Sequence, residues 1–461
     1  MLSTLTLTTQ SKDAPMGLGE NMNRIIGIRH RIKRAADGEM RPTQLAILEG
    51  GAISTFDLAT EQDELDFING NYSPKKGVTL GLRTGDCIAM GLGGSGDLLA
   101  FALSVKAEAL SAKVMRVPPF KLQNFRAEAS KDDDAVTLAN YGATKPEDFY
   151  VLSPRDRKLI ELIEAFRARI EAMKARIGCE QRLRQYFIGR TMLGIYPQGE
   201  IEKQFDNEKA NYPILQALVA EEKRRDSELA RAATQVDVYC QVFAPVEGVG
   251  PATAARIISA VGDIRRFWVL PDEAEMVRLY DESHSIQSQY FDPIEDKIAS
   301  QFTSGMTIWD KLGVAKSHYN RLGNTGAVNA LQMAMDLHQR RSCLKRQAQD
   351  KGINKFRAFC GVHILRDGRF PRRRNNEVAN WHPDARQGLY LLGDQFVKRA
   401  DSDWGKRYRA VKARYHDKHP EVITVDGKKR YTDGHLHKMA IWATIGEFAE
   451  YIFVEWSKLY E

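Results

Sequence analysis

Short apolar runs separated by glycines and charged residues follow a polar N-terminal stretch in the first third of the chain. The strand-like runs cover residues 25–28, 44–48, 52–56, 87–90 and 113–117. Two helical segments stand among them, an apolar one at 98–110 after the glycine-rich 91–96, and another at 133–141. Strands and helices alternating in this way are typical of an α/β domain with a layered sheet. We therefore predict an α/β domain over residues 24–150, preceded by a flexible N-terminus over residues 1–23.

The pattern changes after Ser153 to that of charged, amphipathic helices. Apolar residues recur there at three- and four-residue steps, which is helical spacing. They are Leu159, Leu162, Ile163, Phe166, Ile170, Met173 and Ile177. A second segment of this kind covers residues 212–233, after a Pro/Gly break at 197–199. Together they predict a helical hairpin or coiled coil over residues 151–235. It either packs within one chain, forms a dimer, or serves as a spacer with a solvated charged face.

Residues 244–267 carry the most informative motif, which reads APVEGVGPATAARIISAVGDIRRF. Gly248 and Gly250 surround Val249, and Pro251 stands where a first helical turn would begin. Two glycines at positive φ aim backbone N–H groups and the N-terminus of the following helix at an anion. The motif predicts a helix-hairpin-helix over residues 242–268 that contacts nucleic-acid phosphates; a glycine-rich turn that binds nothing is the alternative. The predicted contacts are Gly248, Gly250, Thr253, Arg256, Arg265 and Arg266.

Positive charge is concentrated toward the C-terminus. The chain has 67 Lys and Arg against 60 Asp and Glu, a net charge of +7 and a pI of about 9.0. Residues 355–461 contain 21 basic and 14 acidic residues, an excess that equals that of the whole chain. Basic residues alternate there with aromatic ones, a combination that binds phosphates and stacks on bases; a solvated basic surface is the alternative. The predicted nucleic-acid contacts are Arg369, Arg372, Arg373, Arg374, Trp381, Lys406, Arg407, Lys428, Lys429 and Arg430.

Several other classes of protein are disfavoured. The five cysteines lie far apart without a Cys-x-x-Cys pair, which argues against a disulfide framework or a zinc ribbon and fits a reducing cytoplasm. The pairs His416/His419 and His435/His437 lack a further ligand, so we predict no metal site there. No apolar run approaches the roughly 18 residues needed to span a bilayer, and the N-terminus lacks the order of a signal peptide. We expect a cytoplasmic protein that does not contact membranes.

The order of these regions resembles that of one bacterial insertion-sequence transposase family. The likeness is carried by residues 114–141, by the Gly-Val-Gly-Pro motif with residues 262–267, and by residues 359–374. Members of this family are RNA-guided recombinases with an N-terminal RuvC-like (RNase H fold) DEDD domain, a coiled coil, and a C-terminal transposase domain with a catalytic serine. Pilin-gene invertases are relatives.

The resemblance implies an RNase H-like α/β fold for residues 24–150 and a mostly α-helical transposase-like domain over residues 236–461. That domain would contain an insertion at 270–352, which is polar and helix-like, and the basic region at 355–461. The implied partners are DNA, a structured guide RNA and further copies of the chain in a dimer or tetramer. Mg²⁺ is the implied cofactor of an active enzyme.

The family's catalytic positions hold different residues in this chain. Four carboxylates would hold two metal ions. Arg29 stands at the first position, Gly91 at the second and Lys131 at the third, and only the fourth is acidic, as Asp134. Asp367 stands at the position of the nucleophilic serine, where a carboxylate is a poor substitute for a hydroxyl.

Other residues are candidates for replacing the missing groups. Asp132 and Asp133 precede Asp134, Glu49 ends a predicted strand, and Ser304 lies in the insertion. Acidic residues at a helix start also complement the helix dipole without any catalytic role. The sequence therefore leaves open whether the chain is an enzyme. We expect a transposase-like protein for RNA-guided DNA binding; the alternatives are an inactive DNA/RNA-binding regulator and an accessory subunit that dimerises with an active transposase.

Overall fold

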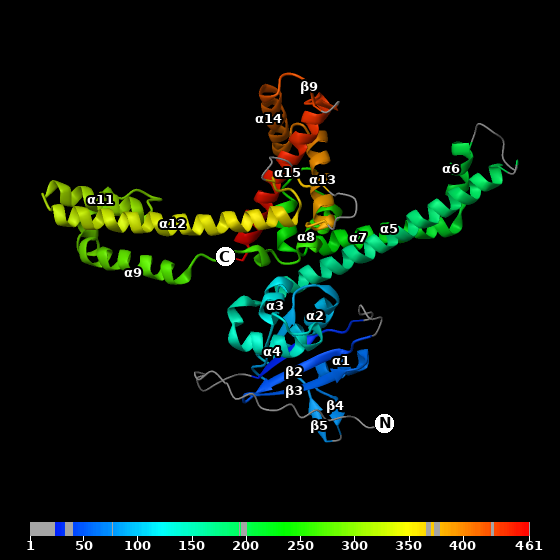
Figure 1. The fold of residues 1–461 in the computed structure, drawn as a ribbon, viewed down its shortest axis with the longest axis horizontal. Helices are drawn as coiled ribbons and strands as arrows, with labels where there is room; N and C mark the ends of the chain where they lie inside the picture. Colours follow the sequence, from blue (N-terminus) through cyan, green and yellow to red (C-terminus); the bar gives the residue numbers. More distant parts are fainter. Residues whose placement is uncertain are drawn as a thin grey trace. The chain divides into compact units, whose positions relative to one another are not determined.

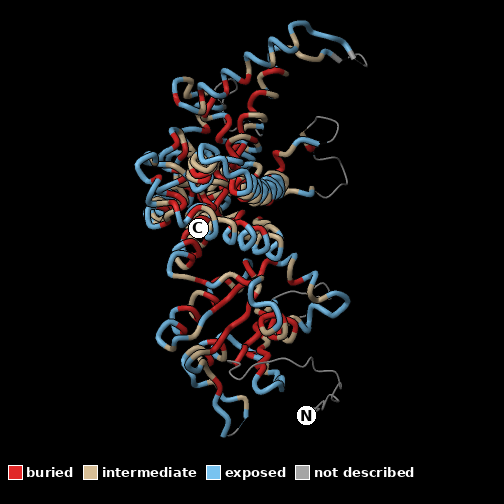
Figure 2. The backbone as a smooth tube through the Cα atoms, turned by 90° about the vertical axis from the view of Figure 1, so that its left-hand side faces the viewer, coloured by how far each residue is buried: buried red, intermediate tan, exposed pale blue. Residues whose placement is uncertain are grey.

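The computed structural model contains two compact units, residues 1–161 and residues 162–461. The described residues are 24–32, 40–75, 77–192, 194, 201–365, 370–372, 379–425 and 428–460. The predicted flexible N-terminus, residues 1–23, lies outside them. Each unit has a buried core of its own: Figure 2 shows buried residues along the strands of the first unit and on the helices of the second.

A mixed six-stranded sheet forms the centre of the first unit (Figure 1). Its strand order is β3-β2-β1-β6-β7-β8. The strands are β1 (Ile25–Arg29), β2 (Thr43–Glu49), β3 (Ala52–Leu58), β6 (Cys87–Gly91), β7 (Lys113–Val117) and β8 (Tyr150–Val151). β1 pairs antiparallel with β2 and parallel with β6, and β7 extends the parallel part. The five strands predicted from apolar runs are confirmed. The sequence pattern does not predict β8 or the hairpin of β4 (Tyr72–Lys75) and β5 (Val78–Leu80).

Helices cover both faces of this sheet. They are α1 (Glu61–Asn69), α2 (Asp97–Ala109), α3 (Pro119–Arg126) and α4 (Asp134–Thr144). Ile26 and Ile28 of β1 belong to the core under α2, whereas Ile25 belongs to the core under α4. α4 packs directly on Gly27, since a Cβ there would stand 2.0 Å from the backbone oxygen of Ala135. The helices predicted at 98–110 and 133–141 are thus confirmed as α2 and α4, while α1 and α3 are additional.

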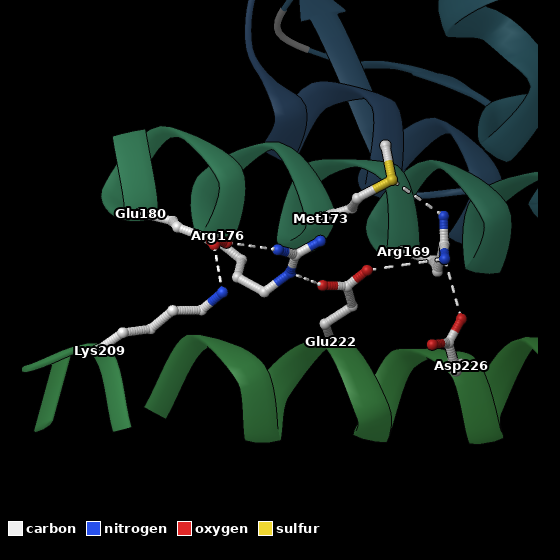
Figure 3. Close-up of polar contacts among 7 residues, drawn as sticks. All are labelled: Arg169, Met173, Arg176, Glu180, Lys209, Glu222 and Asp226. Atoms are coloured by element: carbon white, nitrogen blue, oxygen red, sulfur yellow. Dashed lines mark hydrogen bonds and ion pairs between the residues drawn. The ribbon is translucent and has the colours of Figure 1, made fainter. Parts of the chain in front are cut away.

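The second unit begins within a long helix and includes an antiparallel helical hairpin. Its helices are α5 (Pro154–Met192), α6 (Ile201–Asn211) and α7 (Pro213–Ala233), with α5 starting in the first unit. Ion pairs join α5 to the other two helices (Figure 3). They are Arg169 with Asp226, Arg176 with Glu222, and Lys209 with Glu180. The buried residues between the helices are Cys179, Leu183, Phe187, Phe205 and Leu215. The hairpin therefore packs within one chain, which was one of the arrangements that the sequence allowed.

The helices of the C-terminal region pack around the helix of the glycine-rich motif. These elements are α8 (Pro251–Val261), α13 (Pro383–Lys398), α14 (Asp403–Lys418) and α15 (Asp433–Lys458), with the hairpin of β9 (Ile423–Val425) and β10 (Lys428–Arg430). α13 contacts α8 at Gly388, where a Cβ would stand 2.6 Å from Ile257 Cγ1. It contacts α15 at Gly393, where a Cβ would stand 2.7 Å from Ile441 Cγ2. Close helix packing thus holds the motif and the basic region in the same unit.

The insertion predicted at 270–352 is helical. It consists of α9 (Glu273–Tyr290), α10 (Glu295–Ile298), α11 (Ile308–Arg321) and most of α12 (Thr325–Phe359). α9, α11 and α12 lie side by side (Figure 1), and buried residues such as Leu312 and Leu331 form a core of their own. α12 continues past residue 352, and its Phe356 packs on Phe453 of α15 with ring centroids 5.9 Å apart. The insertion is therefore continuous with a helix of the C-terminal core.

Candidate nucleic-acid interface

The glycine-rich motif forms a loop between a π-helical turn, η4 (Tyr239–Phe243), and α8. Gly248 has a φ of 91°, which confirms the predicted positive φ at this residue. Gly250 has a φ of −89° and a ψ of 166°, so the same prediction is wrong for Gly250. As the residue directly before the helix, Gly250 takes the extended conformation usual at an N-cap. Pro251 is the first residue of α8, as predicted. One glycine, rather than two, turns the chain.

The N-terminus of α8 has features that favour an anion. No side chain caps the helix, so N–H groups of its first turn, which includes the half-buried Thr253, are left for an external acceptor. Arg399 lies over the loop, because a Cβ on Gly248 would stand 2.9 Å from Arg399 Cδ. Chain order does not link Arg399 with Gly248, so sequence reasoning missed this contact. An uncapped helix start and a guanidinium group lie close together as a result.

The three arginines predicted on or after α8 already have partners in the fold. Arg256 Nη1 donates to Asp384 Oδ1 at 2.9 Å. Arg265 donates from Nη2 to Asp263 Oδ2 at 2.7 Å, and Arg266 lies over two aromatic rings at 5.2 and 5.3 Å. A phosphate would compete with these partners for the guanidinium groups. Their predicted phosphate contacts stay predictions.

Basic and aromatic side chains converge at the start of α15. The rings of His419 and Tyr431 stack with centroids 3.8 Å apart and an interplanar angle of 4°, and Tyr431 stacks in turn on His435 at 5.7 Å and 8°. Burial lowers the pKa of His435 below its ordinary value, and the positive charges of Arg430 and Arg372 lower it further. Arg372 and Arg430 were predicted as contacts from separate stretches of the chain, and they act on one side chain. We call Arg372, His419, Arg430, Tyr431, His435 and Lys438 the His435 cluster.

The remaining predicted contacts are in varied settings. Trp381 has the guanidinium of Arg386 over its ring at 4.4 Å and also packs on Gly361, where a Cβ would stand 2.7 Å from Trp381 Cγ, so its stacking on a base stays a prediction. Lys406 and Lys429 are exposed, whereas Arg407 is paired with a glutamate of α15. Arg369, Arg373, Arg374, the catalytic-position residue Asp367 and the side chain of Lys428 lie outside the described residues.

In the first unit, the four positions that the resemblance assigns to metal ligands come to the same end of the sheet. β1 and β6 are parallel and in register up to Ile28 and Met90, so the next residues, Arg29 and Gly91, lie side by side. The first turn of α4 packs on Gly27, two residues before Arg29. Lys131 and Asp134 are at or directly before that turn. These four positions therefore bring together two basic residues, a glycine and a single acid.

The carboxylates at this end of the sheet are bound by arginines rather than left for a metal. Arg126 donates from Nε and Nη2 to the two oxygens of Asp134 at 2.6 and 2.7 Å. Arg41 Nε donates to Asp132 Oδ1 at 3.1 Å. In the part of the chain that the structure describes, no three His, Cys, Asp or Glu side chains are grouped as metal ligands. Because Asp132 and Asp134 are already bound, and a buried arginine rather than an acid ends β1, these residues do not fit a pair of Mg²⁺ ions, which require several free oxygen ligands.

The other replacement candidates do not complete such a site. Asp133 is exposed before α4. Glu49 lies at the far end of β2 from the residue paired with Arg29, and it bonds Arg83 at 2.9 Å. Ser304 is exposed in a turn of the second unit.

Comparison with known proteins adds no family. No protein-family model matches this chain, and no curated protein matches it. Within the described residues, none of the helices has both the length and the apolar character that a membrane crossing requires. Function is therefore inferred from the residues and their arrangement.

Proposed function

We propose that this protein binds nucleic acid through its second unit. The observation that carries the proposal is the His435 cluster, in which the rings of His419, Tyr431 and His435 stack and the positive charges of Arg372, Arg430 and Lys438 act on His435. Guanidinium groups bind phosphate oxygens, and aromatic faces stack on bases. This combination suits unpaired bases, such as those in the loops of a structured RNA.

The α8 loop supplies a second contact in this proposal. The first backbone N–H groups of α8, which no side chain caps, and the guanidinium of the neighbouring Arg399 could together bind one phosphate of a nucleic-acid backbone. Contacts of this kind position the nucleic acid without reading its sequence. Sequence recognition would then depend on a guide RNA, as the family resemblance implies.

We further propose that the first unit is RNase H-like and that the whole chain has a transposase-like architecture for RNA-guided DNA binding. The strand order supports this, since three antiparallel strands are followed by two parallel ones and α4 packs on the central strand β1. Arg29 and the Arg126–Asp134 pair favour the non-cleaving alternative, a DNA/RNA-binding regulator, over an active metal-dependent transposase.

The first experiment is to isolate the full-length protein, sequence the nucleic acid that co-purifies with it, and measure the binding of that RNA as a function of salt. Arg372→Gln/Arg430→Gln should weaken binding and reduce the slope of log K against log[salt] by about 1.4–1.8, which corresponds to two phosphate contacts. Arg278→Gln/Arg340→Gln is the matched control, because these arginines lie on α9 and α12 and pair with Glu275. The control should leave the slope unchanged. Failure of the wild type to bind any oligonucleotide at low salt would refute the proposal.

A further inference from the structure

Three arginines in or next to the strands of the first-unit sheet are buried, and within the described residues one of them, Arg29, has no hydrogen-bond partner. Arg24 donates from Nε and Nη2 to Asp86 at 2.9 and 2.6 Å. Arg116 Nη1 donates to Asp97 Oδ1 at 2.9 Å. Arg29 is 9% exposed, and its Nε and Nη1 are buried without a hydrogen-bond acceptor in the part of the chain that the structure describes. Buried donors in native proteins nearly always have an acceptor, so the exception at Arg29 points to an acceptor that the described residues do not supply.

The side chain of Arg29 is on the sheet face that α4 covers. Alternate residues of a strand face the same side, so Arg29 shares the face of Gly27 and Ile25. Gly27 contacts Ala135 near the start of α4, and Ile25 lies near Gly142 toward its end. α4 therefore runs along β1 with its N-terminal end toward Arg29. A helix N-terminus carries partial positive charge, which adds to that of the guanidinium.

Space is available beside Arg29 for a ligand. A Cβ built on Gly91, the adjacent residue of β6, meets nothing within 4 Å. On the other side of Arg29, the paired residue Gln44 of β2 has its Oε1 buried without a donor. Its amide group can turn to offer Nε2 to an anion. Groups with unused hydrogen-bonding capacity thus line two neighbouring strands.

The charges around this site favour an anion. The acids Asp132, Asp133 and Asp134 are matched in number by the bases Arg41, Arg126 and Lys131. Two of the acids are directly bound, Asp134 by Arg126 and Asp132 by Arg41. Among these described residues, Arg29 adds a positive charge that no acid in the group offsets. A guanidinium group presents N–H donors in the geometry that phosphate oxygens accept.

We propose that Arg29, at the end of β1 beside Gly91 and the start of α4, binds one phosphate group of the nucleic acid without a divalent cation. The proposal rests on the proposed nucleic-acid binding and identifies a contact that the first unit makes. The guanidinium supplies there the positive charge that metal ions would bring to a phosphodiester, but it offers no activated water. The site therefore holds a phosphate and does not cleave it.

The test measures oligonucleotide binding by the full-length protein in EDTA over a range of salt concentrations. Arg29→Gln should reduce the slope of log K against log[salt] by about 0.7 for single strands or 0.9 for duplex DNA, one phosphate contact. Arg83→Gln is the matched control: Arg83 is an exposed arginine of the same unit, bound to Glu49 away from this site. Arg83→Gln should leave the slope unchanged. Arg29→Lys should retain most of the wild-type slope. Equal slopes for the wild type and Arg29→Gln would overturn the proposal.

Hydrogen exchange of the wild type tests the same site without relying on a folded variant. Bound oligonucleotide should slow amide exchange at residues 88–92 and 131–138 in the presence of EDTA. If the wild type binds oligonucleotide and these segments do not change, the Arg29 proposal fails while the proposed function stands. If it binds no oligonucleotide but inorganic phosphate slows exchange in both segments, the phosphate site stands and the proposed function fails. No change with either probe overturns the site.

Discussion

Replacing Gly248 by alanine tests the turn on which the α8 loop depends. At a φ of 91° an L-residue is strained by about 1–2 kcal/mol. A Cβ there would also stand 2.9 Å from Arg399 Cδ, so the arginine would have to move away from the loop. Opposing this, alanine restricts the unfolded chain and favours folding by about 0.4–1 kcal/mol.

Gly250→Ala is a matched control that separates these effects. Gly250 has a φ of −89° that alanine adopts readily, and a Cβ on it meets nothing within 4 Å. The effect on the unfolded chain is common to both substitutions, so it cancels in the comparison. We therefore expect Gly248→Ala to be less stable than Gly250→Ala by about 1–2 kcal/mol.

Denaturant unfolding followed by tryptophan fluorescence measures this difference. All six tryptophans lie at or beyond residue 268, so the signal reports the second unit without interference from the first. The same two variants are then compared in oligonucleotide binding, where displacement of Arg399 should weaken the affinity of Gly248→Ala. Equal unfolding free energies for the two variants would show that Gly248 is not held at positive φ, and the interpretation of the loop would fail.

Two further predictions concern the second unit. Burial, followed by the charges of Arg430 and Arg372, lowers the pKa of His435, so this side chain is neutral at pH 7 and gains a positive charge as the pH falls through that lowered pKa. Oligonucleotide affinity should therefore rise as the pH falls over this interval. In a binding titration, His435→Gln should remove this part of the pH dependence. The side chain of Glu222 is 13% exposed, forms an ion pair with Arg176 and lies 3.6 Å from Arg169. Glu222→Gln should therefore destabilise the α5–α7 hairpin by about 1–2 kcal/mol, a value between those for exposed and buried ion pairs. Hydrogen exchange of the backbone amides of the hairpin measures this loss. The control is Glu171→Gln, at an exposed position of α5, which should change the stability of the hairpin by less than about 0.5 kcal/mol. Equal effects of Glu222→Gln and Glu171→Gln would contradict the stabilising role of the Glu222 ion pairs.

Sequence pattern predicted those elements that show either a continuous apolar run or a regular helical spacing of apolar residues. β1, β2 and β6 are apolar runs that the sheet buries on both faces, and α5 follows its apolar spacing well beyond the predicted turns. α1 was missed because its buried residues are few and its capping box uses Thr60 and Asp63, whereas the usual signature has Glu or Gln at the second position. β8 is too short, at two residues, to show any alternation.

The candidate interface was only partly predictable because its contacts cross long stretches of chain. The alternation of basic with aromatic residues predicted Arg372 and Arg430 as nucleic-acid contacts, but only the fold brings the charges of both to act on His435. The same limit applies in the other direction: Arg256 was predicted as a phosphate contact, and the fold pairs it with Asp384 on α13. Composition counts charges, whereas tertiary packing decides which of them are already neutralised.

The arginines of the first unit bear on whether a single substitution could give this end of the sheet a cleaving metal site. Arg29→Asp would place one carboxylate at the end of β1, but Asp134 would remain bound by Arg126 through both oxygens, and Gly91 would still offer no ligand. A two-metal site needs several free oxygen ligands at once, so a single acid should gain no activity with Mg²⁺. The same substitution places a negative charge where we propose that phosphate binds. It should therefore weaken nucleic-acid binding more than Arg29→Gln does, because repulsion is added to the lost contact.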